Sequence, residues 1–234
     1  MAVPGVVVHR DRWSGHAIPM ANSRRSARST ATWFSDDTVR LDHVVLTEAD
    51  AQWLGAVRRL TVWAVETPPG FFASLPSLEW LDVRGGSGES AQFVNGCARL
   101  RYLAINQIRG MRDLTPIGDL TTLELLKLYG LPQVRSLPSL RRLERLRRIE
   151  AGSLKGIEEL APLLDAPRLE ELVLIRTVAV ASTDPARIAE HPTLSAFNWF
   201  AEDVPNRIWQ PVMSHIGKPK AHAVHPEEWF DSRP

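Results

Sequence analysis

The carboxyl-terminal tail holds the residues whose types could ligate a metal ion. His215, His222 and His225 precede Glu227 and Glu228 within a short stretch, and imidazole and carboxylate groups are common zinc ligands. Their spacing differs from the HExxH pattern, and the sequence has no paired CxxC motif. We therefore predict that these histidines are surface residues and that the protein binds no metal ion and no other cofactor. A metal-dependent factor built on this tail is kept as an alternative hypothesis.

The sequence lacks the motifs of nucleophilic and nucleotide chemistry. It contains no GxSxG elbow, no GxxxxGK[ST] loop and no GxGxxG fingerprint. The glycines at 85–88 follow an expected strand without opening a helix, which favours a loosened turn. Cys97 stands at a position that is aliphatic elsewhere in the chain (Leu120 and Leu143), so we predict a small buried side chain and not a nucleophile. The chain is predicted not to be an enzyme.

A repeat of aliphatic residues runs through most of the chain. The repeated unit is a six-residue box with aliphatic residues at its first, fourth and sixth positions. Successive boxes begin 22, 23, 23, 23 and 25 residues apart. The copies begin at Leu78, Leu100, Leu123, Leu146, Leu169 and Leu194, after a degenerate copy at Val57. The central copies also share further aliphatic positions (Ile108, Leu131 and Leu154) and a proline (Pro116, Pro138 and Pro162). Each aliphatic box predicts a short strand, and each proline predicts a turn on the return path.

These residues resemble the leucine-rich-repeat family, and the segment 112–128 is similar to the short repeats of the bacterial internalin type. The resemblance implies an α/β solenoid, with a parallel β-sheet on the concave face and short 3₁₀ or extended segments on the convex face, capped at both ends. The family usually places asparagine where this chain has Ile108, Leu131 and Leu154. We therefore expect aliphatic packing in place of the asparagine ladder. The resemblance and the excess of arginine over lysine favour a bacterial source.

Three regions follow from the extent of the repeat. Residues 1–53 are predicted to form an amino-terminal cap, 54–200 a solenoid of about seven repeats, and 201–234 a carboxyl-terminal cap or tail. In the first region, 39–46 is expected to be a cap strand, with 6–8 as a candidate hairpin partner, and the basic segment 21–32 a mobile linker or loop. In the last region, the tryptophans Trp209 and Trp229 are expected to shield the final repeat.

The outward side chains of equivalent strands are predicted to align in three ladders, because side chains alternate across a strand. The first ladder is Arg59, Trp80, Tyr102, Leu125, Arg148, Glu171 and Ala196. The second is Thr61, Asp82, Ala104, Lys127, Glu150, Val173 and Asn198. The third is Trp63, Arg84, Asn106, Tyr129, Gly152, Ile175 and Phe200.

Together the ladders form a concave surface that is rich in aromatic residues and arginine, the types that dominate binding hot spots. We predict that a partner protein binds there, on Trp63, Trp80, Arg84, Tyr102, Asn106, Lys127, Tyr129, Arg148, Glu150 and Phe200. The alternative is that these aromatics only reflect the preference of strands for such side chains.

The run RRLERLRR at 141–148 is the densest cluster of charge. It could contact an acidic partner or RNA, which makes a nucleic-acid-binding protein a further alternative. We favour pairing of these arginines with the nearby acids Glu158, Glu159, Glu170 and Glu171. The formal net charge of +1 gives no field that would attract nucleic acid or an anionic membrane, so nucleic acid is not the predicted partner.

The cysteine content and the apolar stretches of the sequence indicate the cellular compartment of the protein. The chain has a single cysteine and no apolar stretch of the roughly 18 to 20 residues that a membrane-spanning helix requires. The short apolar run near the amino terminus precedes its arginines and lacks a clear cleavage site, so it is interpreted as mature chain. We predict a cytoplasmic, non-catalytic protein-binding module, such as an adaptor, an immunity protein or a regulator, with no predicted oligomeric state.

Overall fold

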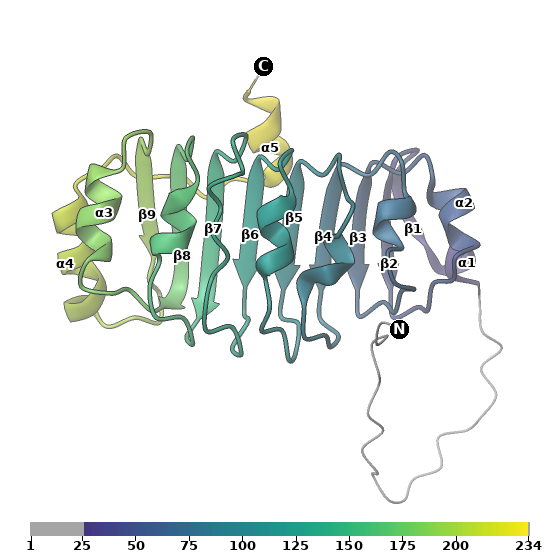
Figure 1. Ribbon diagram of the computed structural model, residues 1–234, viewed down its shortest axis with the longest axis horizontal. Coiled ribbons are helices and arrows are strands. Elements are labelled where there is room, and N and C mark those ends of the chain that lie inside the picture. Colours follow the sequence, from purple (N-terminus) through teal and green to yellow (C-terminus); the bar gives the residue numbers. More distant parts are fainter. Residues whose placement is uncertain (1–25, 234) are drawn as a thin grey trace, which may run out of the picture.

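Each repeat contributes one strand to a single sheet, in which the strands lie side by side (Figure 1). The computed structural model describes residues 26–233. The nine strands follow one another across the sheet in chain order, and every neighbouring pair except β1 and β2 is parallel. The strands are β1 (Thr32–Ser35), β2 (Thr38–Asp42), β3 (Arg59–Trp63), β4 (Trp80–Arg84), β5 (Tyr102–Asn106), β6 (Leu125–Tyr129), β7 (Arg148–Leu154), β8 (Glu171–Val178) and β9 (Ala196–Phe200). This arrangement confirms the predicted leucine-rich-repeat solenoid.

The strand register agrees with the alignment of the repeats. Trp80 pairs with Tyr102, Tyr102 with Leu125, and Leu125 with Arg148, so the first predicted ladder is continuous. The other two ladders are also in register from β3 to β9. The intervening side chains point into the solenoid and are at most 2% exposed: Leu60, Leu81, Leu103, Leu126, Ile149, Leu172 and Phe197. The core therefore lies between the sheet and the return path.

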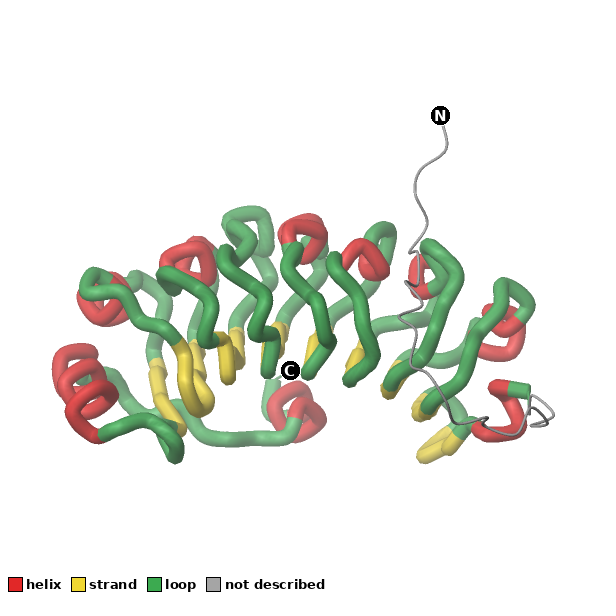
Figure 2. The backbone as a smooth tube through the Cα atoms, turned by 90° about the horizontal axis from the view of Figure 1, so that it is seen from below, coloured by secondary structure: helices red, strands yellow, loops and turns green. Residues whose placement is uncertain are grey.

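Short 3₁₀ helices occupy the return path on the convex face (Figure 2). They are η1 (Phe72–Ser74), η2 (Ala91–Val94), η3 (Thr115–Asp119) and η4 (Ala161–Asp165), and the α-helix α3 (Asp184–Glu190) takes this place after β8. Pro116 and Pro162 lie in the first turn of η3 and η4, where a missing N–H costs no hydrogen bond. The predicted 3₁₀ segments and the turns at Pro116 and Pro162 are thus present, whereas Pro138 lies in an irregular segment without a turn.

Backbone hydrogen bonds connect successive repeats at the ends of the strands, in the absence of the family's asparagine ladder. The residue that follows each of β2 to β6 has a positive φ, and its N–H donates to a carbonyl of the next strand. For example, Gln107 N donates to Tyr129 O at 2.8 Å and Gly130 N to Gly152 O at 3.0 Å. Glycine supplies this conformation at Gly85 and Gly130, at φ of 62° and 66°. Ile108, Leu131 and Leu154 nearby are at most 4% exposed, so these positions pack as aliphatic residues, as predicted.

The amino-terminal region differs from two expectations. Residues 38–42 form β2, which pairs in parallel with β3 in full register and so begins the solenoid. A repeat of 21 residues is sufficient because the short helix α2 (Asp50–Leu54) covers its return path. The antiparallel hairpin partner is β1, whereas the candidate partner at 6–8 lies outside the described residues. Within the basic segment, 27–30 forms the helix α1 (Ala27–Thr30), with Ala27 buried against the core.

The helix α4 (Asn206–Ile216) closes the other end of the solenoid. It contacts α3 and β9, and its Trp209 and Ile216 pack against the main core. Gly217 ends α4 in the left-handed conformation, with φ of 61°. Trp209 therefore covers the last repeat as predicted, but Trp229 does not, because the chain continues away from this end.

Candidate protein-binding surface

The carboxyl-terminal tail crosses the concave surface of the sheet. We use the name tail segment for residues 219–233. It begins beside β9, where Phe197 N donates to Pro219 O at 2.9 Å and Asn198 Nδ2 donates to Ala221 O at 2.9 Å. It then enters the concavity and ends in the helix α5 (Pro226–Asp231), which lies under the middle strands (Figure 2). The prediction that Trp229 shields the final repeat was therefore wrong, because this tail segment carries it onto the inner face.

The helix α5 begins with local signals that its sequence supplies. Pro226 occupies the first turn, and the Glu228 side chain accepts a hydrogen bond from the N–H of His225 at 3.3 Å. Such reciprocal capping satisfies donors that have no partner inside the helix. The helix is short, so tertiary contacts must provide most of its stability. Those contacts come from Trp229 and Phe230 in α5 and from Arg233, which follows it.

An aromatic cluster joins α5 to the sheet. Trp229 is 3% exposed and packs with Trp80, Tyr102 and Leu125 of the first ladder. Phe230 lies with its ring centroid 4.7 Å from that of Trp80, which in turn lies 5.3 Å from that of Tyr102. Tilted arrangements at these distances are favourable for aromatic pairs. Burial raises the pKa of the Tyr102 hydroxyl, so this group is neutral at physiological pH.

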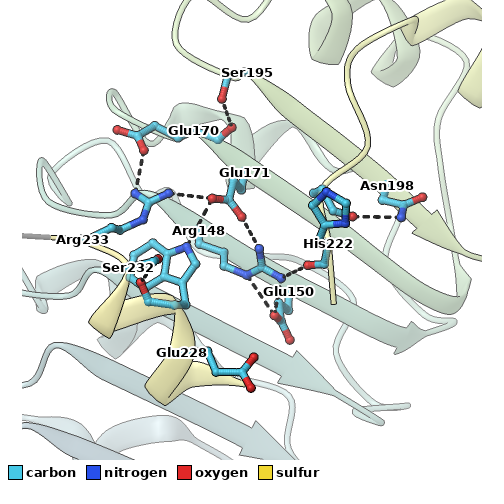
Figure 3. Close-up of polar contacts among 12 residues, drawn as sticks. Arg148, Glu150, Glu170, Glu171, Ser195, Asn198, His222, Glu228, Ser232 and Arg233 are labelled. Atoms are coloured by element: carbon cyan, nitrogen blue, oxygen red, sulfur yellow. Dashed lines mark hydrogen bonds and ion pairs between the residues drawn. The ribbon is translucent and has the colours of Figure 1, made fainter. Parts of the chain in front are cut away.

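Two glutamates at the start of β8, Glu171 and the preceding Glu170, hold the end of the tail segment (Figure 3). The guanidinium of Arg233 donates to Glu170 Oε2 at 2.7 Å and to Glu171 Oε1 at 2.6 Å. Trp229 Nε1 also donates to Glu171 Oε1, at 3.3 Å. Burial raises the pKa of Glu170, but the hydrogen bonds from Arg233 and Arg147 outweigh it and leave the pKa below its usual value. The glutamate pair is therefore an anionic anchor for a cationic side chain.

Arg148 lies beneath the tail segment and connects it to the sheet. Its side chain is 1% exposed, and it is paired with both Glu150 and Glu171. Its Nη2 donates to Glu150 Oε1 and to the carbonyl oxygen of His222, each at 2.8 Å (Figure 3). Lys127 Nζ also lies 2.9 Å from Glu150 Oε2. The charges under the tail segment thus balance one another within the sheet.

The tail segment changes the accessibility of the predicted binding residues. Trp80, Tyr102, Arg148 and Glu150 are at most 7% exposed, so the expectation that they are free for a partner was wrong in this structure. The physical reason is that the chain's own aromatic and basic residues occupy the same surface. The accessible members of the predicted set are Trp63 and Arg84, which are exposed, and Asn106, Lys127, Tyr129 and Phe200, which are half-buried.

A hollow of about 430 Å³ lies beside the tail segment over β2 to β6. Its lining includes Arg59, Asp82, Arg84 and Asn106 from the sheet and Glu227 from α5. Asp82 Oδ2 accepts a hydrogen bond from Arg84 Nε at 2.9 Å, whereas Asp82 Oδ1 and Asn106 Oδ1 have no hydrogen-bond partner within 26–233. Buried acceptors of this kind are costly unless a donor reaches them. Both oxygens are closed off from solvent in this state, so a donor from a ligand reaches them only when neighbouring side chains move.

The arginine run pairs with acids of neighbouring repeats. Arg147 pairs with Glu170, and Arg142 Nη1 lies 2.6 Å from Asp119 Oδ1. The expected pairing with Glu170 and Glu171 is present, but Glu159 lies near Arg187, at 3.9 Å, and not near the run. Exposed pairs of this type stabilise little, yet they leave few free cations for a phosphate backbone.

Cys97 and the histidines of the tail segment were the other candidates for chemistry. Cys97 is 6% exposed, and burial raises the pKa of its thiol to about 11, so it is protonated at neutral pH. Among the residues that the structure describes, no three histidine, cysteine or acidic side chains are grouped so that they could hold a metal ion. His225 caps α5, and His222 contributes its carbonyl oxygen to Arg148. No helix in the described part of the chain is long and apolar enough to span a membrane.

Comparisons with known proteins give a limited result. No protein-family model and no curated protein match the sequence. Among solved structures, internalin C2 from Listeria monocytogenes is similar at 19% identity and a TM-score of 0.49, over 70% of this chain and 80% of that chain. An internalin (inlF) from the same species is similar at 17% identity and a TM-score of 0.45, over 78% of this chain and 58% of that chain. The function of this chain is therefore inferred from its own residues.

Proposed function

We propose that this chain is a non-catalytic protein-binding module whose partner docks on the concave surface, at the part that the tail segment leaves open. The observation that supports this most directly is the hollow over β2 to β6, which the tail segment does not fill and which Arg59, Arg84 and Asn106 line. Trp63, 41% exposed, and the exposed Arg84 lie next to each other on β3 and β4 beside it. An exposed aromatic residue and an arginine beside a hollow suit a protein ligand.

The role within the cell is a further part of the proposal. A buried, protonated and single cysteine agrees with a reducing compartment, and we place the protein in the cytoplasm of a bacterial cell. Adaptor, immunity and regulatory roles all use such a surface, and the fold supports each of them. Nucleic acid is not favoured, because several arginines of the 141–148 run pair with acids of neighbouring repeats.

A double substitution of Trp63→Ala and Arg84→Ala tests this role. We expect capture of the partner from native cell extract to fall at least tenfold, because hot-spot truncations cost about 2 kcal/mol or more in binding. The matched control is Arg112→Ala with Arg142→Ala, two exposed arginines outside the strands. The control variant should keep its stability to within about 1 kcal/mol, since exposed side chains contribute little. Loss of Arg84 also leaves the buried Asp82 carboxylate without its ion-pair partner, so the test variant is compared only after its circular dichroism is shown to be native. Quantitative mass spectrometry of the captured proteins provides the measurement.

Two results would contradict the proposal. One is a captured set that is the same for the wild type, the control and the Trp63/Arg84 variant. The other is the absence of any protein enriched above the background of an unrelated solenoid bait.

A further inference from the structure

We infer that the tail segment is an intramolecular ligand, which a partner displaces by presenting the same chemistry: a short helix with two adjacent aromatic residues followed by an arginine. This inference rests on the protein-binding role proposed above and specifies the ligand. In the chain itself these groups are Trp229, Phe230 and Arg233. The partner would then occupy both the open hollow and the groove in which α5 lies.

The first support is that the solenoid core does not depend on the end of the tail segment. The buried apolar residues form two separate clusters, a large one inside the solenoid and a small one on the concave surface. Trp229 belongs to the small cluster only, with Trp80, Tyr102, Ala104 and Leu125. Because hydrophobic stabilisation follows the area removed from water, departure of α5 exposes the small cluster and leaves the large one closed.

The second support is the balance of charge beneath the tail segment. When α5 leaves, Arg148 keeps its carboxylate partners Glu150 and Glu171 and loses only the carbonyl oxygen of His222. Lys127 continues to pair with Glu150. No charge is then left both buried and unpaired, which is the situation that makes the breaking of a buried ion pair expensive. The open surface is therefore a stable state of the protein, and not a partly unfolded one.

The third support is the way in which the tail segment is attached. Residues 217–225 form neither helix nor strand, and the anchors that follow are the aromatic pair and Arg233. A ligand on such a short tether has an effective concentration in the millimolar range, so even a weak docking contact stays closed. An external segment must compete with that closed state, and its apparent affinity falls by the fraction of molecules that are open.

The groove also defines what a competitor must carry. Trp80 and Tyr102 accept aromatic rings, and Arg59 lies over Trp80 with its guanidinium carbon 4.2 Å from the ring centroid. At the far end, Glu170 and Glu171 share one guanidinium. A guanidinium suits this pair because its planar fork can donate to both carboxylates at once, which an ammonium group does less well. The position of the arginine, three residues after the aromatic pair, completes the pattern.

The test uses a fluorescent peptide with the sequence of residues 221–234 and two full-length proteins. One protein is the wild type, and the other carries Trp229→Ala, Phe230→Ala and Arg233→Ala, which should empty the groove without touching the solenoid core. We expect the triple variant to bind the peptide saturably and at least tenfold more tightly than the wild type. A peptide with alanine at both aromatic positions is the matched control and should bind at least tenfold more weakly. Adding Glu170→Gln and Glu171→Gln to the triple variant should also weaken its binding of the unmodified peptide at least tenfold.

Two results would overturn the inference: absence of peptide binding by the triple variant while its circular dichroism is native, and equal binding by both proteins. If the triple variant does not fold, the single change Arg233→Glu serves instead, because it weakens the same anchor by charge reversal.

The result of the peptide test is independent of the capture experiment, which needs no peptide. The triple variant should also capture at least tenfold more partner than the wild type, and excess peptide should release that partner. If the peptide binds but the capture does not change in this way, the inference that a partner displaces the tail segment would be overturned.

Discussion

Replacement of Leu126 with alanine is expected to lower the free energy of unfolding by about 2 to 5 kcal/mol. Leu126 lies in β6 at the middle of the solenoid, is 0% exposed, and pairs in register with Leu103 on one side and Ile149 on the other. Its removal therefore leaves a cavity that borders both neighbouring repeats. Because each repeat is stabilised by its neighbours, a defect at this place weakens the whole stack. Urea unfolding followed by circular dichroism measures the change.

Two controls make this result specific. Leu126→Met keeps the volume of the side chain and should cost less than about 1.5 kcal/mol. Arg142→Ala removes an exposed side chain, 67% exposed, and should change the free energy by no more than about 0.5 kcal/mol. If Leu126→Ala cost no more than Leu126→Met, the continuous core that the repeats predict would be wrong.

Replacement of Arg148 with alanine is expected to cost about 3 to 5 kcal/mol, the usual range for removing one partner of a buried ion pair. Arg148 is 1% exposed and holds Glu150, Glu171 and the carbonyl oxygen of His222 together. Without it, two carboxylates face each other below the tail segment. The protein can reduce this cost by releasing the tail segment, which lets water reach the carboxylates. We therefore expect faster proteolysis between residues 217 and 225 as well as lower stability.

The substitution Arg148→Lys distinguishes the contribution of the positive charge from that of the guanidinium geometry. Lysine keeps the positive charge but lacks the planar fork that reaches both glutamates and the carbonyl oxygen, so we expect an intermediate loss in urea unfolding. A loss below about 1 kcal/mol for Arg148→Ala, together with unchanged proteolysis, would show that this arginine does not connect the tail segment to the sheet.

The sequence was sufficient to predict the solenoid and its register. Inward leucines such as Leu103 and Leu126 recur at nearly constant spacing, and stacking equivalent positions leaves one alignment that buries all of them. The same alignment placed Trp80, Tyr102 and Arg148 on the concave surface. It did not identify β2 as part of the solenoid, because Asp36 stands where the following boxes begin with an aliphatic residue, Val57 and Leu78.

The position of the tail segment could not be predicted from the repeat. Trp229 and Phe230 have no equivalents in other repeats, and Trp229 contacts Glu171 across 58 residues of sequence. Such contacts depend on the direction in which the chain leaves α4 and on the length of the linker at 217–225, and neither has a periodic signal. The available sequence signal was chemical: two aromatics and an arginine at the end of the chain match the residue types that the concave surface binds.

A double-mutant cycle between Trp80 and Phe230 tests most directly whether the tail segment occupies the concave surface. With Trp80→Ala, Phe230→Ala and the double variant, the account predicts a coupling energy of about 0.5 to 1.5 kcal/mol in urea unfolding, because the two rings are in contact. The control cycle pairs Phe230→Ala with Trp33→Ala, in the edge strand β1, and should be additive to within about 0.5 kcal/mol because two strands separate β1 from β4. Additivity in the Trp80 cycle as well would show that the tail segment does not occupy the concave surface.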